Sequence, residues 1–230
     1  MQAIILAAGE GTRMRPLTYH VPKPLVRVGG KNLVEHNLAK LPPEITELIF
    51  VVGYLAEQVI NHFGDTYEGR PVHYVRQRKL RGTADAVSLC KPLIRGRFMV
   101  FMGDDMYSQE DMQACLAHER SWLVKKVHGK FTGGRIVQNE SGNVVDAIEG
   151  THDTTEGFVS TNMFVLTPEY FSYPMVAIKD GAEYGLPQTV VSMAKEYPVK
   201  LIEAKDWKQV SDLNDIKKLR HYIEQSHKGH

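Results

Sequence analysis

The chain has 230 residues, of which 43% are hydrophobic and 24% charged, and its formal net charge is +1. This length suits one large α/β domain or a domain with a subdomain. The near-neutral charge excludes a protein built to bind nucleic acid along its length. The apolar start is too short for a signal-peptide core, and no apolar run is long enough to span a membrane. We therefore expect a cytoplasmic protein with neither nucleic acid nor membrane as a partner.

The cysteines and histidines indicate no metal site of their own. Cys90 and Cys115 lie far apart in the sequence, without a CxxC pattern, and the ten histidines show no HxH or HExxH spacing. We therefore expect reduced thiols, no structural metal site and no zinc hydrolase.

Apolar runs of strand length alternate with stretches of helical spacing along the chain. We expect strands at 3–8, 48–52, 72–75, 98–102, 144–148, 159–166 and 199–202. We expect helices at 32–41, 56–63, 83–93 and 109–119. The alternation predicts βαβ units and a mostly parallel sheet flanked by helices.

The pattern changes from about residue 124 onward. Short apolar segments now alternate with glycine-rich turns such as Gly133-Gly134, which predicts an antiparallel insertion that forms the second wall of a cleft. A last helix is expected at 212–225, with Ser211 as its N-cap and an apolar face that includes Leu219 and Ile223.

The first predicted strand runs into a glycine loop, in the segment LAAGEGTRMRPLT. The backbone N–H groups of Gly9 and Gly11 are suited to cradle phosphates, and Arg13 adds a fixed positive charge. Lys23 follows between two prolines, which restrict the backbone on both sides of it. This combination favours a clamp for a triphosphate.

Two other phosphate loops fit this segment less well. The dinucleotide-binding loop needs a third glycine where Met14 stands, and the loop of ATPases continues with GKS or GKT where this chain has GTRMRP. The triphosphate clamp is therefore the preferred interpretation.

Together, LAAGEGTRMRPLT and PKPLVRVGGKNLVEHNL resemble the signature of the sugar-1-phosphate nucleotidylyltransferases. Further matches, VVGYLAEQV, RGTADAV and FMGDD, follow in family order. The resemblance implies an α/β, Rossmann-like nucleotidyltransferase fold, with a mixed, mostly parallel central sheet and a smaller antiparallel insertion on the sugar side. It implies a single domain over residues 1–230, with a nucleotide-binding part at about 1–123, a sugar-binding part at about 124–206 and the C-terminal helix.

The implied activity is Mg²⁺-dependent transfer of a nucleoside monophosphate from a nucleoside triphosphate to a sugar 1-phosphate, with release of pyrophosphate. Positioning and charge neutralisation supply most of the rate in such a reaction, and Arg13 and Lys23 match the cations of the family. Asp104 follows the predicted strand 98–102 and matches the metal-binding Asp of the family's GD motif. The second family ligand has no clear counterpart, because Gln209 and Ser211 stand in its usual positions and Asp212 lies one residue further on. Asp212 is left with two roles, as a metal ligand or as part of the helix N-terminus.

Gln77 and Gly82 resemble the residues with which family members hold uracil or thymine. A side-chain amide donates and accepts at once, which suits the pyrimidine edge, and glycine permits close approach of the backbone to the base. The resemblance therefore implies UTP or dTTP as the nucleotide, and the choice between the two stays open.

Sugar contacts are implied for Glu149 and Asn162. The lysine that follows the glutamate in the family's EKP triplet is missing, because this chain reads EGT. Lys179 and Lys205 are candidates to replace it, and the sequence does not choose between them.

The full set of predicted site residues is as follows. The catalytic residues are Arg13 and Lys23, the metal ligands Asp104 and Asp212, the nucleotide-binding residues Leu6, Ala8, Gly9, Gly11, Thr12, Gln77, Gly82 and Thr83, and the sugar-binding residues Gly103, Glu149 and Asn162.

Two alternatives remain beside this prediction. One is a CTP-dependent cytidylyltransferase that acts on a phosphorylated alcohol, against which Gln77 and Gly82 argue. The other is a non-catalytic regulator that binds a nucleotide sugar, against which the retention of Arg13, Lys23 and Asp104 argues. The sequence also leaves open the sugar and the oligomeric state, a homo-oligomer included.

Overall fold

The computed structural model describes residues 1–178 and 181–226. Its central strand is β1 (Gln2–Ala7), which is wholly buried and pairs in parallel with a strand on each side. The parallel part of the sheet consists of β7 (Phe98–Met102), β1, β4 (Glu47–Val52) and β6 (Arg70–Arg76), with the short β5 (Thr66–Tyr67) antiparallel at the edge. β1, β4 and β7 are buried on both faces and read as continuous apolar runs, which is why they were predicted well. β6 is only partly buried and is longer than the predicted 72–75, and β5 was not predicted.

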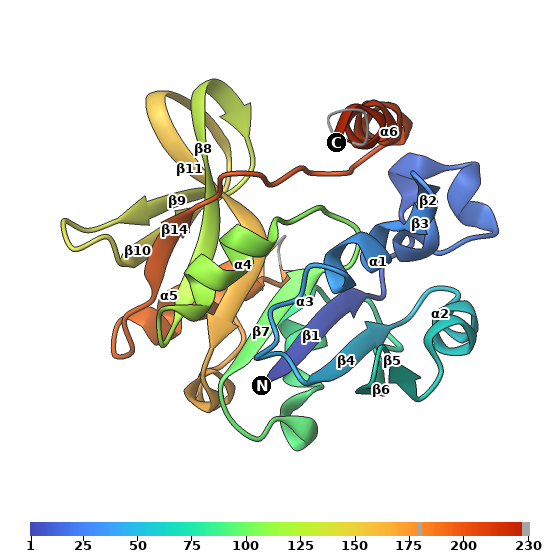
Figure 1. Ribbon diagram of the computed structural model, residues 1–230. Coiled ribbons are helices and arrows are strands. Elements are labelled where there is room, and N and C mark those ends of the chain that lie inside the picture. Colours follow the sequence, from blue (N-terminus) through green and yellow to red (C-terminus); the bar gives the residue numbers. More distant parts are fainter. Residues whose placement is uncertain (179–180, 227–230) are drawn as a thin grey trace.

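The other half of the sheet is built around β11 (Thr151–Leu166), which is antiparallel to β7. It also pairs with β8 (Ser121–Thr132) and β9 (Arg135–Gln138), while β10 (Val144–Ile148) extends β9 and β14 (Lys200–Glu203) runs parallel to β8. Figure 1 shows β8 and β11 continuing beyond the sheet as a long ribbon.

The expectation of short strands here was wrong, since β8 has 12 residues and β11 has 16. Their inner ends lie in the core and their outer parts are solvated, so neither presents one uniform sequence pattern.

Helices cover both faces of the sheet. On one face, α1 (Leu33–Leu38), α2 (Ala56–Phe63) and α4 (Gln109–Leu116) contribute to one apolar core. On the other face, α3 (Thr83–Ser88) and α5 (Leu186–Ala194) contribute to a second. Because helices cover both faces of the sheet, a ligand can reach it at the carboxyl ends of the parallel strands, where open α/β sheets bind their ligands.

Three expected helices are shorter than predicted, and one helix was missed. The expected helix 83–93 breaks after Ser88, and a separate turn follows at Lys91–Leu93, where Pro92 cannot continue the helix. The expected helices 32–41 and 109–119 end at Leu38 and Leu116. α5 was not predicted, because its β-branched residues have low helix propensity and its tertiary contacts decide instead.

Short elements complete the described chain. These are the strands β2 (Arg27–Val28), β3 (Lys31–Asn32), β12 (Ala177–Ile178) and β13 (Glu183–Tyr184), and 3-10 turns at Thr12–Met14, Leu17–Tyr19, Lys23–Leu25, Lys91–Leu93 and Pro168–Ser172. None of the described helices is both long and apolar enough to cross a membrane.

The last helix, α6 (Leu213–Ser226), lies far from the strand that precedes it. In Figure 1 an extended segment leaves β14 and crosses the molecule to α6, which lies beside β2 and β3. The helix is capped by Asp212, whose Oδ1 accepts the N–H groups of Asn214 (2.8 Å) and Asp215 (3.0 Å). The prediction of Ser211 as N-cap was therefore wrong by one residue; Ser211 instead donates its N–H to Asp215.

Candidate functional site

A cavity of about 500 Å³ opens at the carboxyl ends of the parallel strands. The predicted residues that line it are Leu6, Ala8, Gly9, Gly11, Thr12, Arg13, Lys23, Gln77, Gly82, Thr83, Asp104, Glu149 and Asn162. Gly103 and Asp212 are not among the described residues that line it, although Ser211 is. Residues that lie far apart in the sequence are thus brought together at the sheet edge where open α/β folds bind ligands.

The glycine loop packs tightly against Thr18 and Lys23. Gly11 has a φ of 62°, and a Cβ there would lie 3.1 Å from the Cβ of Lys23 and 3.2 Å from Thr18. Its carbonyl accepts hydrogen bonds from the Thr18 hydroxyl (2.8 Å) and from the N–H of Met14 (2.9 Å). A larger residue at position 11 would combine an unfavourable φ with a steric conflict, so the turn requires glycine.

Met14 anchors this loop. It is fully buried in an apolar cluster with Val26, Val28 and residues of α6, among them Leu219 and Ile223. The side chain that replaces the third glycine of a dinucleotide-binding loop therefore fastens the loop to the C-terminal helix.

Lys23 and Asp104 both line the cavity and form an ion pair there, with Nζ and Oδ2 2.5 Å apart. Their side chains are 9% and 18% exposed, so solvent screens this pair only in part. Gly103, just before Asp104, donates its N–H to Leu6 (3.0 Å), and a Cβ there would lie 3.1 Å from Ile5. Gly103 thus permits the close approach of β7 and β1 that sets Asp104 beside the glycine loop.

The carboxylates of the site fit a magnesium ion that is shared with phosphates. No group of three or more His, Cys, Asp or Glu side chains suited to hold a metal gathers among the residues described. Mg²⁺ is commonly held by one or two carboxylates together with water and substrate phosphates, so Asp104 with one further carboxylate suits it. A complete protein cage, as structural zinc requires, is not formed by the described side chains.

Asp212 lies within electrostatic reach of Arg13. The pKa of its carboxyl lies below the usual value, chiefly because it accepts the N–H of Asp215, and the charge of Arg13 acts in the same direction. The helix cap uses Oδ1. Its role as metal ligand stays a prediction.

Gln77 lies in the cavity wall with its amide in a fixed orientation. Its Nε2 donates to the carbonyl of Gly82 (3.0 Å) and to the carboxylate of Asp85 (2.9 Å). Since both N–H groups are used within the protein, the amide presents only its oxygen to a ligand. The expectation that this amide donates and accepts at once therefore needs correction.

Gly82 has a φ of 92°, and the space of a Cβ is filled by the backbone of Tyr184, whose N would lie at 2.7 Å. Tyr184 in turn donates its N–H to Arg81 (2.8 Å). Glycine is therefore required at position 82 because the backbone of residues 181–185 packs against it, whether or not a base also approaches it.

The sugar-side residues come from β11 and the turn before it. The pairing of β11 with β8 shifts register between Ser160 and Met163, and Asn162 within this bulge has a φ of 55°. Bulges of this kind redirect a side chain, and here Asn162 lines the cavity. Glu149 accepts a hydrogen bond from Gln188 of α5 (3.0 Å).

The missing lysine of the sugar side has no assigned replacement. Lys205 pairs with Glu110 on α4 and does not belong to the described cavity lining. Lys179 lies outside the described residues.

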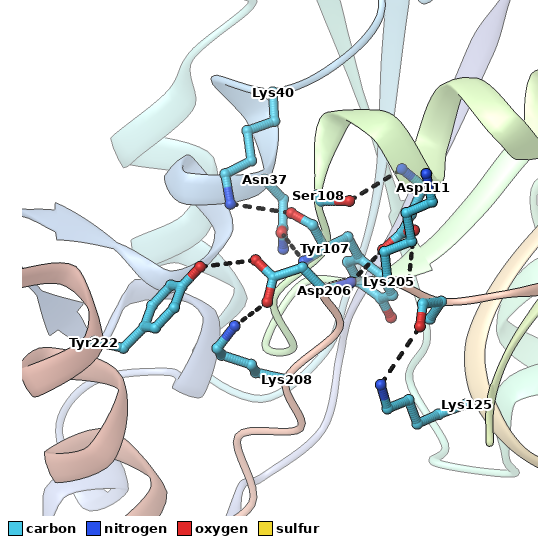
Figure 2. Close-up of polar contacts among 11 residues, drawn as sticks. Asn37, Lys40, Tyr107, Ser108, Asp111, Lys125, Lys205, Asp206, Lys208 and Tyr222 are labelled. Atoms are coloured by element: carbon cyan, nitrogen blue, oxygen red, sulfur yellow. Dashed lines mark hydrogen bonds and ion pairs between the residues drawn. The ribbon is translucent and has the colours of Figure 1, made fainter. Parts of the chain in front are cut away.

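The segment between β14 and α6 is hydrogen-bonded to Asp111 of α4 and to Tyr222 of α6 (Figure 2). Asp111 accepts the N–H groups of Lys205 (2.9 Å) and Asp206 (3.1 Å), and Asp206 accepts the hydroxyl of Tyr222 on α6 (2.9 Å). Lys208 exchanges two backbone hydrogen bonds with Met106. The position of Asp104 therefore depends on residues about 100 positions later in the chain.

Asp105 is buried, is not among the described residues that line the cavity, and accepts the N–H of Val210 (3.1 Å). Burial, and after it the charge of Asp104, raises the pKa of its carboxyl to about 7. Asp105 is therefore a structural residue of this loop.

Tyr107 links the Asp104 loop to the Asn162 bulge. Its buried hydroxyl donates to the carbonyl of Thr161 (2.7 Å), and its N–H donates to Asn37 of α1 (3.1 Å). Burial raises the pKa of this hydroxyl well above its usual value, so it remains a donor. Sequence reasoning missed Tyr107, Asp85 and Gln188, because their roles depend on partners that no local motif reveals.

Comparisons with known proteins agree with this geometry. The Nucleotidyl transferase family model matches residues 2–225. The UTP–glucose-1-phosphate uridylyltransferase AglF of Haloferax volcanii is 33% identical over 199 residues, which is 83% of this chain and 82% of AglF. The bifunctional protein GlmU of Methanocaldococcus jannaschii is 25% identical over 225 residues; the match covers 97% of this chain but 54% of GlmU.

Two solved structures share the fold. A putative glucose-1-phosphate thymidylyltransferase from Bacillus anthracis superposes with a TM-score of 0.81 at 21% identity, covering 97% of this chain and 95% of that one. The inositol-1-phosphate CTP transferase from T. maritima superposes with a TM-score of 0.76 at 21% identity, covering 97% and 94%. These likenesses confirm the expected fold class.

Proposed function

Because the chain belongs to the nucleotidyl transferase family, we propose that it transfers UMP or dTMP from UTP or dTTP to a sugar 1-phosphate and releases pyrophosphate. One observation carries the proposal: the glycine loop, the Lys23–Asp104 pair, Gln77 and the sugar-side residues line a single cavity. The similarity to AglF, a UTP–glucose-1-phosphate uridylyltransferase, supports UTP and a sugar 1-phosphate as the substrates.

In this reaction an oxygen of the sugar phosphate attacks the α-phosphorus, and the bond to the pyrophosphate oxygen breaks. The protein's contribution is to position the reactants and to neutralise charge. The backbone of Gly9 and Gly11 holds the phosphates, and Arg13 and Lys23 supply the positive charge. Lys23 is already beside Asp104, so its ammonium needs only a small movement to reach a phosphate bound there.

Asp104, with Asp212 as the second carboxylate, is the proposed holder of Mg²⁺. The bound ion would neutralise phosphate oxygens and orient the triphosphate. Leu6, Ala8, Thr12 and Thr83 shape the walls around the nucleotide.

On the sugar side, Glu149 accepts hydrogen bonds from the sugar hydroxyls, and the amide of Asn162 both accepts and donates them. Residues 1–123 would then form the nucleotide part of one domain and residues 124–206 the sugar part, with the C-terminal helix bracing the first. We place the enzyme in the cytoplasm, which the two free cysteines favour.

A screen of pyrophosphate release tests this function. UTP, dTTP, CTP, ATP and GTP are each offered with Mg²⁺ and with a panel of sugar 1-phosphates and phosphorylated alcohols. We expect release with UTP or dTTP and one or a few sugars. Release with CTP and a phosphorylated alcohol alone would establish the cytidylyltransferase instead, a candidate that the superposition with the inositol-1-phosphate CTP transferase favours.

A regulator without activity is the remaining candidate. It would bind a nucleotide sugar, as measured by calorimetry, and release no pyrophosphate with any pair of substrates.

A further inference from the structure

The amide of Gln77 is held by a buried carboxylate that no motif assigns to the site. Asp85, on the first turn of α3, is 4% exposed, and its Oδ2 accepts from Nε2 of Gln77 at 2.9 Å. Its other oxygen accepts from Arg81 at 2.7 Å. A carboxylate that is paired with a guanidinium in this way offers only acceptors to its neighbours.

This arrangement excludes the opposite orientation of the Gln77 amide. If the amide were turned by 180°, its oxygen would face the carbonyl of Gly82 and the carboxylate of Asp85, two acceptors at hydrogen-bond distance. An oxygen in that position is repelled by both. None of the described residues donates a hydrogen bond to Oε1, so this oxygen remains to accept from a ligand in the cavity.

An acceptor in a fixed position distinguishes the pyrimidine bases. Uracil and thymine carry an N–H at position 3, which can donate to Oε1. Cytosine has a lone pair at that position, which meets Oε1 as acceptor against acceptor. An amide that is free to rotate could bind uracil, thymine or cytosine, whereas an amide held with Oε1 toward the base binds only uracil and thymine.

We propose that Asp85 is the positioning residue that locks Gln77 as an acceptor, so that the site takes a pyrimidine with an N–H at position 3 and rejects cytosine. This inference rests on the proposed function for the place of the base. Its specific content is that discrimination between UTP and CTP resides in a carboxylate that does not touch the nucleotide. Its test uses binding without a sugar phosphate, and therefore does not depend on turnover.

The experiment measures the dissociation constants of UTP and CTP by calorimetry, with Mg²⁺ present, for the full chain and three variants. For the unchanged protein we expect UTP to bind about 10- to 100-fold more tightly than CTP. In Asp85→Ala the amide is free to rotate, so UTP binding weakens, CTP binding does not, and the ratio falls to within about threefold. A merely structural role would weaken both nucleotides alike.

Two further variants serve as controls. Arg81→Ala removes the cation, whose side chain is 53% exposed, but leaves the acceptor for Gln77, and should keep most of the preference. Asp85→Asn can still turn a carbonyl toward Gln77, and should restore part of the ratio lost in Asp85→Ala. If Asp85→Ala does not fold, the double variant R81M/D85L removes the carboxylate together with its cation and should show the same loss of ratio.

The outcomes separate the two proposals. A folded Asp85→Ala, or R81M/D85L, with the original ratio overturns the role of Asp85 and leaves the proposed function intact. Equal binding of UTP and CTP by the unchanged protein also overturns it. Absence of pyrophosphate release with every sugar phosphate contradicts the proposed function, even where the UTP preference and its loss are observed.

Discussion

The two walls of the cavity are built by different means. The nucleotide wall consists of short loops at the ends of parallel strands, and its key side chains already have protein partners: Lys23 pairs with Asp104, and Gln77 is held by Asp85. The sugar wall depends on one bulge in β11 and on a glutamate held by a neighbouring helix. Under the proposed function, the first wall is preorganised for phosphates and a base, whereas the second depends on a few exposed contacts that can vary with the substrate.

The nucleotide wall is also braced from outside the sheet. α6 and the segment before it pack against Met14 and bond to the loop after Asp104, through Met106 and Asp105. Changes in this bracing should affect nucleotide binding and stability together, and changes in the sugar wall should affect neither.

The largest effect is expected for Asp104→Asn. Loss of the carboxylate at the α-phosphate should lower turnover by about 10²- to 10³-fold or more, with UTP binding reduced much less. Pyrophosphate release and calorimetry measure the two quantities. Unchanged turnover would show that Asp104 takes no part in the reaction and would favour the candidate of a non-catalytic regulator.

Leu219→Ala tests the bracing of the nucleotide wall. Leu219 is 3% exposed in the cluster that holds Met14, so its truncation should cost about 2–4 kcal/mol of unfolding free energy. Denaturant titration measures the loss, and UTP binding should weaken because the glycine loop loosens. The matched control is Leu213→Ala on the same helix, where the side chain is 38% exposed and the loss should be smaller. Equal losses would contradict the packing described.

Asn162→Gly tests the sugar wall by itself. Glycine keeps the positive φ without strain and removes only the amide. We expect the KM for the sugar phosphate to rise about tenfold, while the KM for UTP and the unfolding free energy stay nearly constant. A parallel rise in the KM for UTP would show that the two walls are not independent.

Substitutions at Asp212 distinguish a role as helix N-cap from a role as metal ligand. Asp212→Ala should lose about 1 kcal/mol of stability, whereas Asp212→Asn keeps a good N-cap and should lose almost none. If Asp212 also holds Mg²⁺, Asp212→Asn lowers turnover and raises the Mg²⁺ concentration needed for tight UTP binding. Normal turnover with normal Mg²⁺ dependence in Asp212→Asn would leave the residue as a cap alone.

The smallest effect is expected for the cysteines. Cys90 and Cys115 are fully buried, and burial raises the pKa of each thiol to about 12. Only thiolates react readily, so a thiol reagent at pH 8 should modify neither residue until the protein unfolds. Rapid modification of the folded protein would show that one face of the sheet opens.

The nucleotide wall could be predicted from the sequence because its chemistry is local. The glycine loop, Lys23 between two prolines and Asp104 at a strand end are each contained in a few consecutive residues. The sugar wall was predicted less well, since the bulge at Asn162 depends on pairing with β8, a strand whose lysines and glycine interrupt its apolar pattern.

Other features depend on contacts that no local pattern contains. α5 forms because Leu186, Val190 and Met193 are buried, despite poor helix propensity. The amide of Gln77 was expected to donate and accept, and only the position of Asp85 shows that its donors are already used.

A crystal structure with UTP and Mn²⁺ would show whether Asp104 and the glycine loop hold the ion and the triphosphate, because the anomalous signal of Mn²⁺ locates the ion independently of the protein. We expect the triphosphate against Gly9 and Gly11, the ion beside the carboxylate of Asp104, and N3 of uracil at hydrogen-bond distance from Oε1 of Gln77. A triphosphate bound elsewhere, or an ion remote from Asp104, would contradict this expectation.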